Sequence, residues 1–111
     1  ALEDKKDIEK IKRLESINGI GISIASAILT VCYPNNFTIA DYRAKNSLIN
    51  FFGQKEEDTD YSTPEAYLNY VGVCINLAEN NKIKLRDFDR ILWGIDFYEG
   101  SGGLKELTRD L

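Results

Sequence analysis

Hydrophobic residues recur at helical spacing along most of the chain, and no stretch sustains the alternation expected of a strand. In residues 3–16 the apolar residues Ile8, Ile11 and Leu14 are three positions apart, with charged residues between them. Residues 22–33 are apolar on nearly every side, so we expect this second helix to lie in the centre of the domain. The pattern therefore predicts an amphipathic helix followed by a central one.

A third helix is predicted after a short break. Residues 34–36 contain a proline and two asparagines, which end the second helix, and residues 37–39 form an extended connector. The third helix is expected over about residues 40–52, with Asp41 in its first turn and Gly53 as its stop. Residues 54–63 are polar and acidic, and we expect them to form a solvated, mobile loop.

Two longer helices are predicted in the second half. Thr63 and Pro64 are a typical helix start, a capping hydroxyl followed by proline at the first helical position, for a helix that runs to about Asn80. Another helix is expected over about residues 85–98, and a short one over residues 104–111. Three aromatic residues of the 85–98 helix are expected in its core-facing stripe, with base stacking as the alternative for the tryptophan: Phe88, Trp93 and Phe97.

These elements predict a single all-α domain over residues 1–111, a compact bundle of about five or six helices. The chain has 18 acidic and 14 basic residues, a net charge of −4, which argues against strong nonspecific binding of nucleic acid. A local site at a helix end needs no net charge. Histidine, the commonest general base, is absent. No apolar run is long enough to predict a membrane-spanning helix.

The two cysteines, Cys32 and Cys74, both fall in apolar runs. We expect them to be buried free thiols of a cytoplasmic protein in a reducing compartment. Two cysteines cannot build a four-cysteine iron–sulfur or zinc site. A chain that starts at Ala1 and contains no methionine is expected to be an excerpt of a longer or processed protein.

The segment that joins the first two helices carries the most specific pattern in the chain. Gly19 and Gly21 form a Gly-x-Gly turn, so that residues of about 4–33 are predicted to be a helix–hairpin–helix. The backbone N–H groups of Gly21, Ile22 and Ser23 lie at the start of the second helix, where such groups can bind a phosphate. The alternative is that the glycines only close a tight turn between two helices.

A longer pattern includes this turn. Ile17-x-Gly19-Ile20-Gly21-x-x-x-Ala25, followed by a helix, the proline-bearing connector and then Asp41, resembles the helix–hairpin–helix and Gly/Pro/Asp signature of the endonuclease III superfamily of base-excision DNA glycosylases. The resemblance covers roughly residues 10–52.

The resemblance implies a role for several residues. Asp41 falls on the essential carboxylate, which activates the nucleophile or stabilises the positively charged sugar as the base leaves. Gly19 and Gly21 fall on the hairpin glycines, and the hairpin, with Ile22 and Ser23, would bind a phosphate of double-stranded DNA. Some main-chain carbonyl groups fall where the family often binds Na⁺ or K⁺: those of Glu15, Ile17 and Ile20.

Departures from the family pattern narrow the expected chemistry. Ser23 replaces the lysine that forms a Schiff base in bifunctional members, so an active enzyme would be a monofunctional glycosylase without lyase activity. The hairpin proline is replaced by Asn18, and the cysteines of the iron–sulfur cluster are missing. Typical members are longer, and their base pocket lies between two helical domains, so a second domain or a protein partner would supply the missing wall.

Several alternatives stay open at the level of sequence. Asp41 can act as a helix cap alone, and Arg43 can contact a DNA phosphate or be solvated. The whole chain can be a non-catalytic helical module that keeps the fold and binds DNA or a protein. Two basic clusters lie beside acidic residues, and we interpret both as ion-paired faces: Lys5, Lys6, Lys10, Lys12 and Arg13 near the start, and Lys82, Lys84, Arg86 and Arg90 further on.

Overall fold

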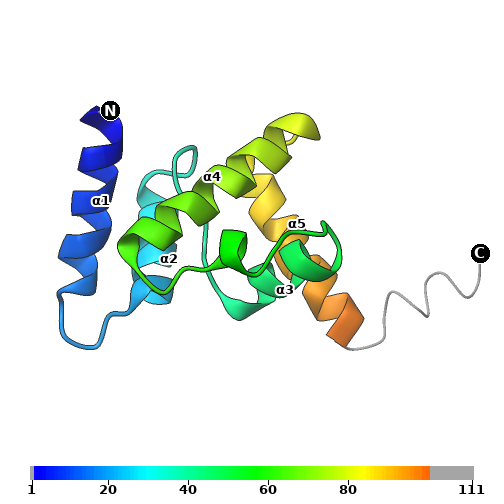
Figure 1. The fold of residues 1–111 in the computed structure, drawn as a ribbon, viewed down its shortest axis with the longest axis horizontal. Helices are drawn as coiled ribbons and strands as arrows, with labels where there is room; N and C mark the ends of the chain where they lie inside the picture. The colour runs from blue at the N-terminus through cyan, green and yellow to red at the C-terminus, as the bar shows by residue number, and fades with distance from the viewer. Residues whose placement is uncertain (1, 101–111) are drawn as a thin grey trace, which may run out of the picture.

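The structure is a computed structural model that describes the backbone of residues 2–100 and the side chains of residues 6–98. Within that part it contains only helices, listed in chain order: α1 (Leu2–Glu15), α2 (Ile22–Cys32), α3 (Tyr42–Asn50), the short 3-10 helix η1 (Glu57–Thr59), α4 (Pro64–Asn80) and α5 (Leu85–Gly100) (Figure 1). The all-α bundle predicted from the hydrophobic pattern is confirmed. The helix predicted over residues 104–111 lies outside the described residues.

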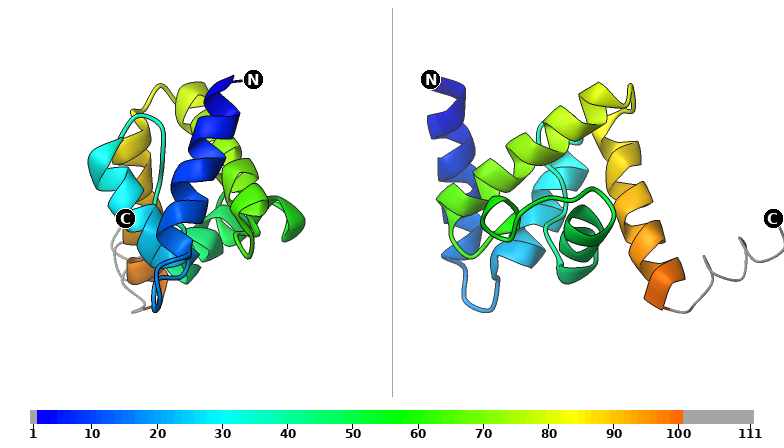
Figure 2. Two further views of the ribbon diagram at one scale, coloured as in Figure 1. Left: turned by 90° about the vertical axis from the view of Figure 1, so that its left-hand side faces the viewer. Right: turned by 45° about the vertical axis from the view of Figure 1, so that its right-hand side comes forward.

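The helices pack so that α3 and α5 form one side of the molecule and the hairpin of α1 and α2 forms the other. Helix α4 crosses between them and contacts both α1 and α5 (Figures 1 and 2). The buried core contains side chains from all five α-helices, including Ile11 of α1, Leu29 of α2, Leu48 of α3, Tyr67 of α4 and Phe88 of α5. The Ser47 hydroxyl also donates a hydrogen bond to a main-chain carbonyl of α5.

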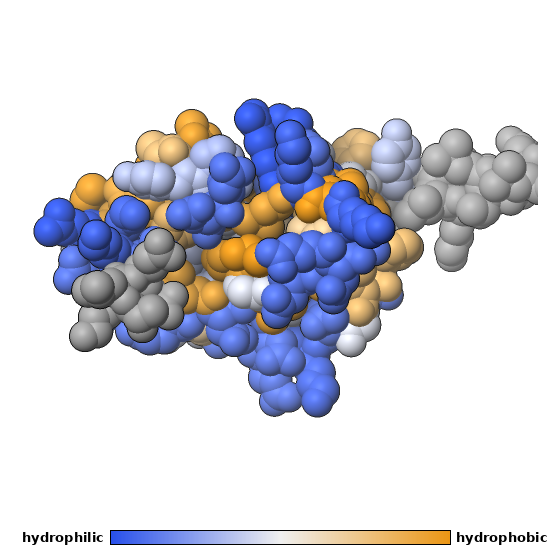
Figure 3. Space-filling view, turned by 90° about the horizontal axis from the view of Figure 1, so that it is seen from above, coloured by the Kyte–Doolittle hydropathy of each residue, from blue (hydrophilic) through white to orange (hydrophobic). Residues whose placement is uncertain are grey.

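Helix α2 differs from its prediction, because only one of its sides is buried. Ala25 and Leu29 are buried, whereas Ile24 and Ile28 are exposed and Val31 is 82% exposed. The apolar sequence of α2 reflects an uncovered face, so the prediction of a central helix is wrong. Seen from above, the surface has hydrophobic side chains lying between hydrophilic ones (Figure 3).

The two cysteines lie in different environments. Cys32, in the last turn of α2, is exposed, so the prediction of two buried thiols is wrong for this residue. Cys74 of α4 is buried, as predicted, and loss of solvent raises the pKa of its thiol to about 12.

Local signals in the sequence set most helix boundaries. Asp41 caps α3 by accepting a hydrogen bond from the Ala44 N–H at 2.9 Å. Thr63 caps α4 in the same way, with Pro64 in the first turn. Gly53 has a φ of +68°, the left-handed conformation expected of a residue that stops a helix. The third helix is shorter than predicted, at residues 42–50.

The acidic loop is partly buried against the rest of the protein, whereas the sequence predicted a solvated loop. Thr59 is fully buried, and its hydroxyl donates to the Lys55 carbonyl at 3.0 Å. The 3-10 helix that contains Thr59 packs on α4. The prediction of a solvated loop is therefore wrong at this residue, because the loop covers part of the core.

The extended connector before α3 is held by hydrogen bonds from two helices. The Ala40 N–H donates to the Ser26 hydroxyl oxygen of α2 at 2.9 Å. From α4, the Tyr67 hydroxyl donates to the Thr38 carbonyl at 2.8 Å and the Tyr70 hydroxyl donates to the Ile39 carbonyl at 3.4 Å. These bonds satisfy three main-chain groups of the connector and fix the place where Asp41 begins α3.

A candidate carboxylate cavity and the hairpin surface

Helix α5 presents two different faces. Leu85, Phe88 and Leu92 form its buried stripe. A second set of residues has the spacing i, i+3, i+4 and i+7, which places them together on another face: Arg86, Asp89, Arg90 and Trp93. This second face borders the start of α3 and makes the candidate site.

A cavity of about 310 Å³, here called the carboxylate cavity, lies at that border. It is lined by Asp41, which begins α3, and by Asp89 and Trp93 of α5, with Ile39 and Arg90 beside them. Two carboxyl groups and an indole ring therefore share one small space. This arrangement suits a planar polar group together with a centre of positive charge.

Asp89 is the most perturbed acid of the cavity. Partial burial raises the pKa of its carboxyl to about 6, and the charge of Asp41 acts in the same direction. The Thr38 hydroxyl, which donates to Asp89 Oδ1 at 3.1 Å, opposes this increase, as do the Ile39 N–H and Arg90. Near neutral pH this carboxyl can therefore hold or release a proton.

The aromatic residues beside the cavity are not in the core, contrary to the prediction. Trp93 is 47% exposed and Phe97 is 48% exposed, and their rings stack with centroids 5.8 Å apart. The Arg43 guanidinium lies 5.0 Å from the centre of the Trp93 ring and pairs with Asp96 at 3.5 Å. Arg43 thus contacts two residues of α5 instead of being simply solvated. Its guanidinium lies against the exposed aromatic rings next to Asp41.

The hairpin forms a separate and wider surface. Gly19 has a φ of +88°, a conformation that favours glycine, and it turns the chain between α1 and α2. Gly21 is the N-cap of α2 and offers no side-chain hydrogen bond to the first turn. Gly21, Ile22 and Ser23 line a depression of about 630 Å³, here called the hairpin depression. The uncapped start of α2 thus faces an open surface, as an anion site requires.

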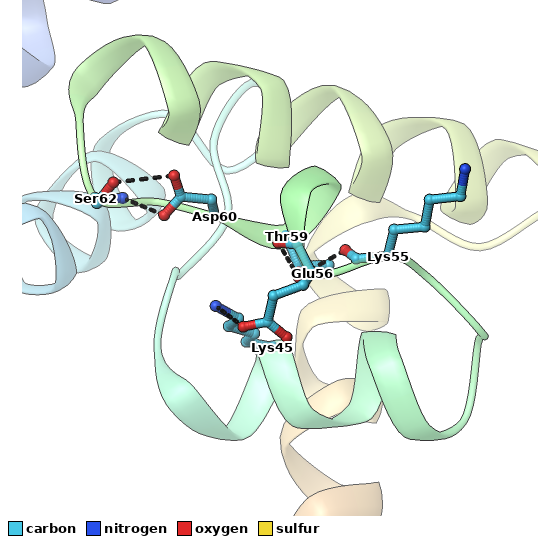
Figure 4. A network of polar contacts seen from close by, with 6 residues as sticks. All are labelled: Lys45, Lys55, Glu56, Thr59, Asp60 and Ser62. Atoms are coloured by element: carbon cyan, nitrogen blue, oxygen red, sulfur yellow. Dashed lines mark hydrogen bonds and ion pairs between the residues drawn. The ribbon is translucent and has the colours of Figure 1, made fainter.

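Charged groups in the hairpin depression offset one another. Lys45 of α3 lines it, but its ammonium group pairs with Glu56 at 2.9 Å (Figure 4). Asp60 accepts hydrogen bonds from the N–H and the hydroxyl of Ser62, each at 3.0 Å, and these bonds lower the pKa of its carboxyl. Glu15 adds another acid to the lining. An anion at the start of α2 would depend on the N–H groups more than on side-chain charge.

The structure places the predicted site residues on two surfaces. Glu15, Gly21, Ile22 and Ser23 line the hairpin depression, whereas Gly19, Ile17 and Ile20 are not part of its lining. Asp41 lines the carboxylate cavity. Helix α3 runs between them, because Asp41 begins it and Lys45 follows one turn later. Of the three carbonyls assigned to a cation, that of Ile17 accepts a hydrogen bond from the Ile20 N–H at 3.0 Å within the turn.

Sequence reasoning missed Asp89 as a site residue. It treated this acid only as a neighbour of basic residues. The available signal was its position at the edge of the apolar stripe, one turn after Leu85 and three residues before Leu92. A carboxylate at the edge of such a stripe is partly desolvated, and that is unusual enough to mark a candidate site.

Fold and surfaces together define a small all-α protein with a helical hairpin and a cavity lined by two carboxyl groups. Comparison with protein-family models, curated proteins and solved structures finds no match for this chain. Among the described residues, no helix is both long and apolar enough to cross a membrane. The same residues contain no group of three or more His, Cys, Asp or Glu side chains placed to hold a metal ion.

Proposed function

We propose that this chain is a DNA-binding helix–hairpin–helix domain of the base-excision glycosylase type, and that it removes a base from double-stranded DNA with Asp41 as its carboxylate. One observation carries the proposal. Asp41 stands at the fixed start of α3 and lines a cavity that also contains Asp89 and Trp93. The family resemblance of the hairpin supports the same reaction.

The chemistry follows from the charge that develops on the sugar. As the N-glycosidic bond breaks, its electron pair leaves with the base and positive charge builds at C1′. The Asp41 carboxylate stabilises that charge, then accepts a proton from the water that adds to C1′. Asp89, in its protonated form, donates a proton to the departing base. Ser23 cannot form an imine with the sugar, so the DNA strand stays intact.

Duplex binding is assigned to the hairpin depression. The N–H groups at the start of α2, around Ile22 and Ser23, bind a backbone phosphate. The carbonyls of Glu15, Ile17 and Ile20 would hold Na⁺ or K⁺, which supplies positive charge to that phosphate. A second domain of a longer protein, or a protein partner, closes the open side of the cavity.

The replacement of Asp41 by asparagine tests the proposal. Asparagine still caps a helix, so Asp41→Asn retains the fold while the negative charge is removed. We expect base release to fall by a factor on the order of 100 or more, with duplex binding unchanged. The measurement uses duplexes that carry uracil, hypoxanthine, 8-oxoguanine or 7-methylguanine, and detects abasic sites by alkaline cleavage.

Asp58→Asn is the matched control, since Asp58 lies in η1 and lines neither surface. This variant should release bases at the wild-type rate. Equal release by wild type and Asp41→Asn would overturn the enzymatic proposal.

A second candidate function is a non-catalytic module that binds a protein or DNA. The uncovered apolar face of α2, formed by Ile24, Ile28 and Val31, favours it, because exposed apolar faces are typical of protein contacts. This alternative predicts no base release from any of the four duplexes. It also predicts that Asp41→Asn leaves every binding measurement unchanged.

A further inference from the structure

The two basic clusters of the chain differ in how their charges are paired. On α1, Lys10 pairs with Asp7 at 3.6 Å and Lys12 pairs with Glu65 at 3.3 Å, so the prediction of an ion-paired face holds for these two residues. At the corner between α4 and α5 it is wrong for all of the predicted bases except Arg90. Three exposed bases of this corner make no ion pair with any described residue: Lys82, Lys84 and Arg86.

Arg90, one turn after Arg86, is paired only weakly. It lies 3.7 Å from Asp87, and both side chains are more than half exposed to solvent. Such an exposed pair contributes little and is easily exchanged for another anion. The first two turns of α5 thus present two arginines that are available to a ligand.

These arginines line a cavity of their own. Arg86 and Arg90, together with Thr30 of α2 and Pro34 just after that helix, line a space of about 280 Å³, here called the arginine cavity. It shares Ile39, Asp89 and Arg90 with the carboxylate cavity. The two cavities are therefore neighbours along one face of α5, with Asp89 and Arg90 at their boundary.

The chemistry of the arginine cavity favours an anion with several oxygen atoms. Each guanidinium offers planar donors that match two phosphate oxygens at once. The Thr30 hydroxyl already donates to the Ser26 carbonyl at 2.7 Å, so the arginines are the donors that remain. Asp89 also lines this cavity, and its negative charge would oppose the binding of an anion. Its Oδ1 already accepts a hydrogen bond from the Thr38 hydroxyl.

We propose that Arg86 and Arg90 bind a backbone phosphate of the DNA strand whose nucleotide enters the carboxylate cavity. This inference rests on the proposed function, because it assigns a second phosphate contact to the same substrate. The hairpin and the arginine cavity would then contact the DNA backbone at two places, with Asp41 between them in the bound complex. Neither contact reads the base sequence.

The test measures how salt weakens binding. A fluorescently labelled duplex with a tetrahydrofuran abasic-site analogue is titrated with the full chain between about 50 and 200 mM salt, the range over which phosphate contacts are lost. For Arg86→Gln with Arg90→Gln we expect affinity to fall about tenfold and the slope of log affinity against log salt to decrease by about 1.

Lys10→Gln with Lys12→Gln is the matched control, because it removes the same charge from the paired face of α1. Its salt slope should stay at the wild-type value. An unchanged slope in the arginine variant, or an equal decrease in both variants, would overturn the inference. In either case base release by wild type and Asp41→Asn still decides the proposed function separately. A wild-type chain that does not bind the duplex would overturn both.

Discussion

The hairpin depression and the carboxylate cavity represent two ways of making a site. The hairpin depression is wide, about 630 Å³, and its useful donors are main-chain N–H groups of one continuous segment. The carboxylate cavity is half that size, about 310 Å³, and its groups come from α3, the connector and α5. We propose that the first binds a phosphate, whereas the second brings together two carboxyl groups and an indole ring. Binding and chemistry are thus assigned to different parts of the fold.

The largest expected effect distinguishes the buried face of α5 from the face that lines the carboxylate cavity. Phe88 is fully buried in the core-facing stripe of α5, so Phe88→Ala should lower the free energy of unfolding by about 3–5 kcal/mol. Trp93 lies on the exposed face of the same helix, so Trp93→Ala should lower the free energy of unfolding much less, by about 1 kcal/mol. Chemical denaturation of both variants measures the difference. Equal losses would contradict the two-faced description of α5.

The next largest effect is the change in protein stability with pH that the Asp89 carboxyl causes in the carboxylate cavity. Its pKa is raised from 3.8 to about 6 by folding, so the folded state binds the proton more tightly than the unfolded state. The resulting stabilisation is complete below about pH 3.8 and is lost as pH rises through about 6. Compared with Asp89→Asn, the wild type should lose on the order of 1 kcal/mol between pH 4 and pH 7, after allowance for solvent screening.

Thermal denaturation at a series of pH values gives this difference. Parallel stability curves for the two proteins would show that Asp89 titrates normally. Base release offers a second readout, because a proton donor with this pKa predicts a rate that falls as pH rises through about 6 in the wild type alone.

The smallest expected effect on stability comes from a substitution in the hairpin, which tests whether the hairpin binds a phosphate. Gly21 has an extended backbone and no atom within 4 Å of an added Cβ, so Gly21→Glu should change the free energy of unfolding by only a few tenths of a kcal/mol. The added carboxylate would nevertheless repel a phosphate at the start of α2, lowering duplex affinity and its salt dependence.

Gly19→Ala is the matched comparison. At φ +88° an alanine is strained, so Gly19→Ala should lower the free energy of unfolding by about 1 kcal/mol, although it adds no charge to the surface. Duplex affinity should therefore follow the charge at position 21 and not the strain at position 19. If Gly21→Glu binds like the wild type, the hairpin is only a turn.

How far the sequence predicts this molecule depends on how local each feature is. Thr63 and Pro64 specify the start of α4, and Gly19 specifies the hairpin turn, through interactions within a few residues. Asp41 was predicted to be at a helix start for the same reason. Asp89 was not predicted to be in the site, because its hydrogen-bond partner, Thr38, is 51 residues away in the chain.

The errors in burial have the same physical origin. An apolar helix can be buried on all sides or can have an uncovered face, and its own residues do not distinguish the two. Val31 and Cys32 are therefore exposed where burial was predicted, and Trp93 lies beside a cavity where core packing was predicted. These positions depend on which helices cover which faces, and that is a property of the assembled bundle.

Base release by wild type and by Asp41→Asn is the measurement that tests the central claim most directly. Both proteins are incubated with the four damaged duplexes, and abasic sites are counted after alkaline cleavage, with duplex affinity measured in parallel. The account predicts release from at least one duplex by the wild type, a loss on the order of 100-fold or more in Asp41→Asn, and equal affinities. Release that is unchanged in Asp41→Asn, or absent from the wild type on every duplex, would contradict it.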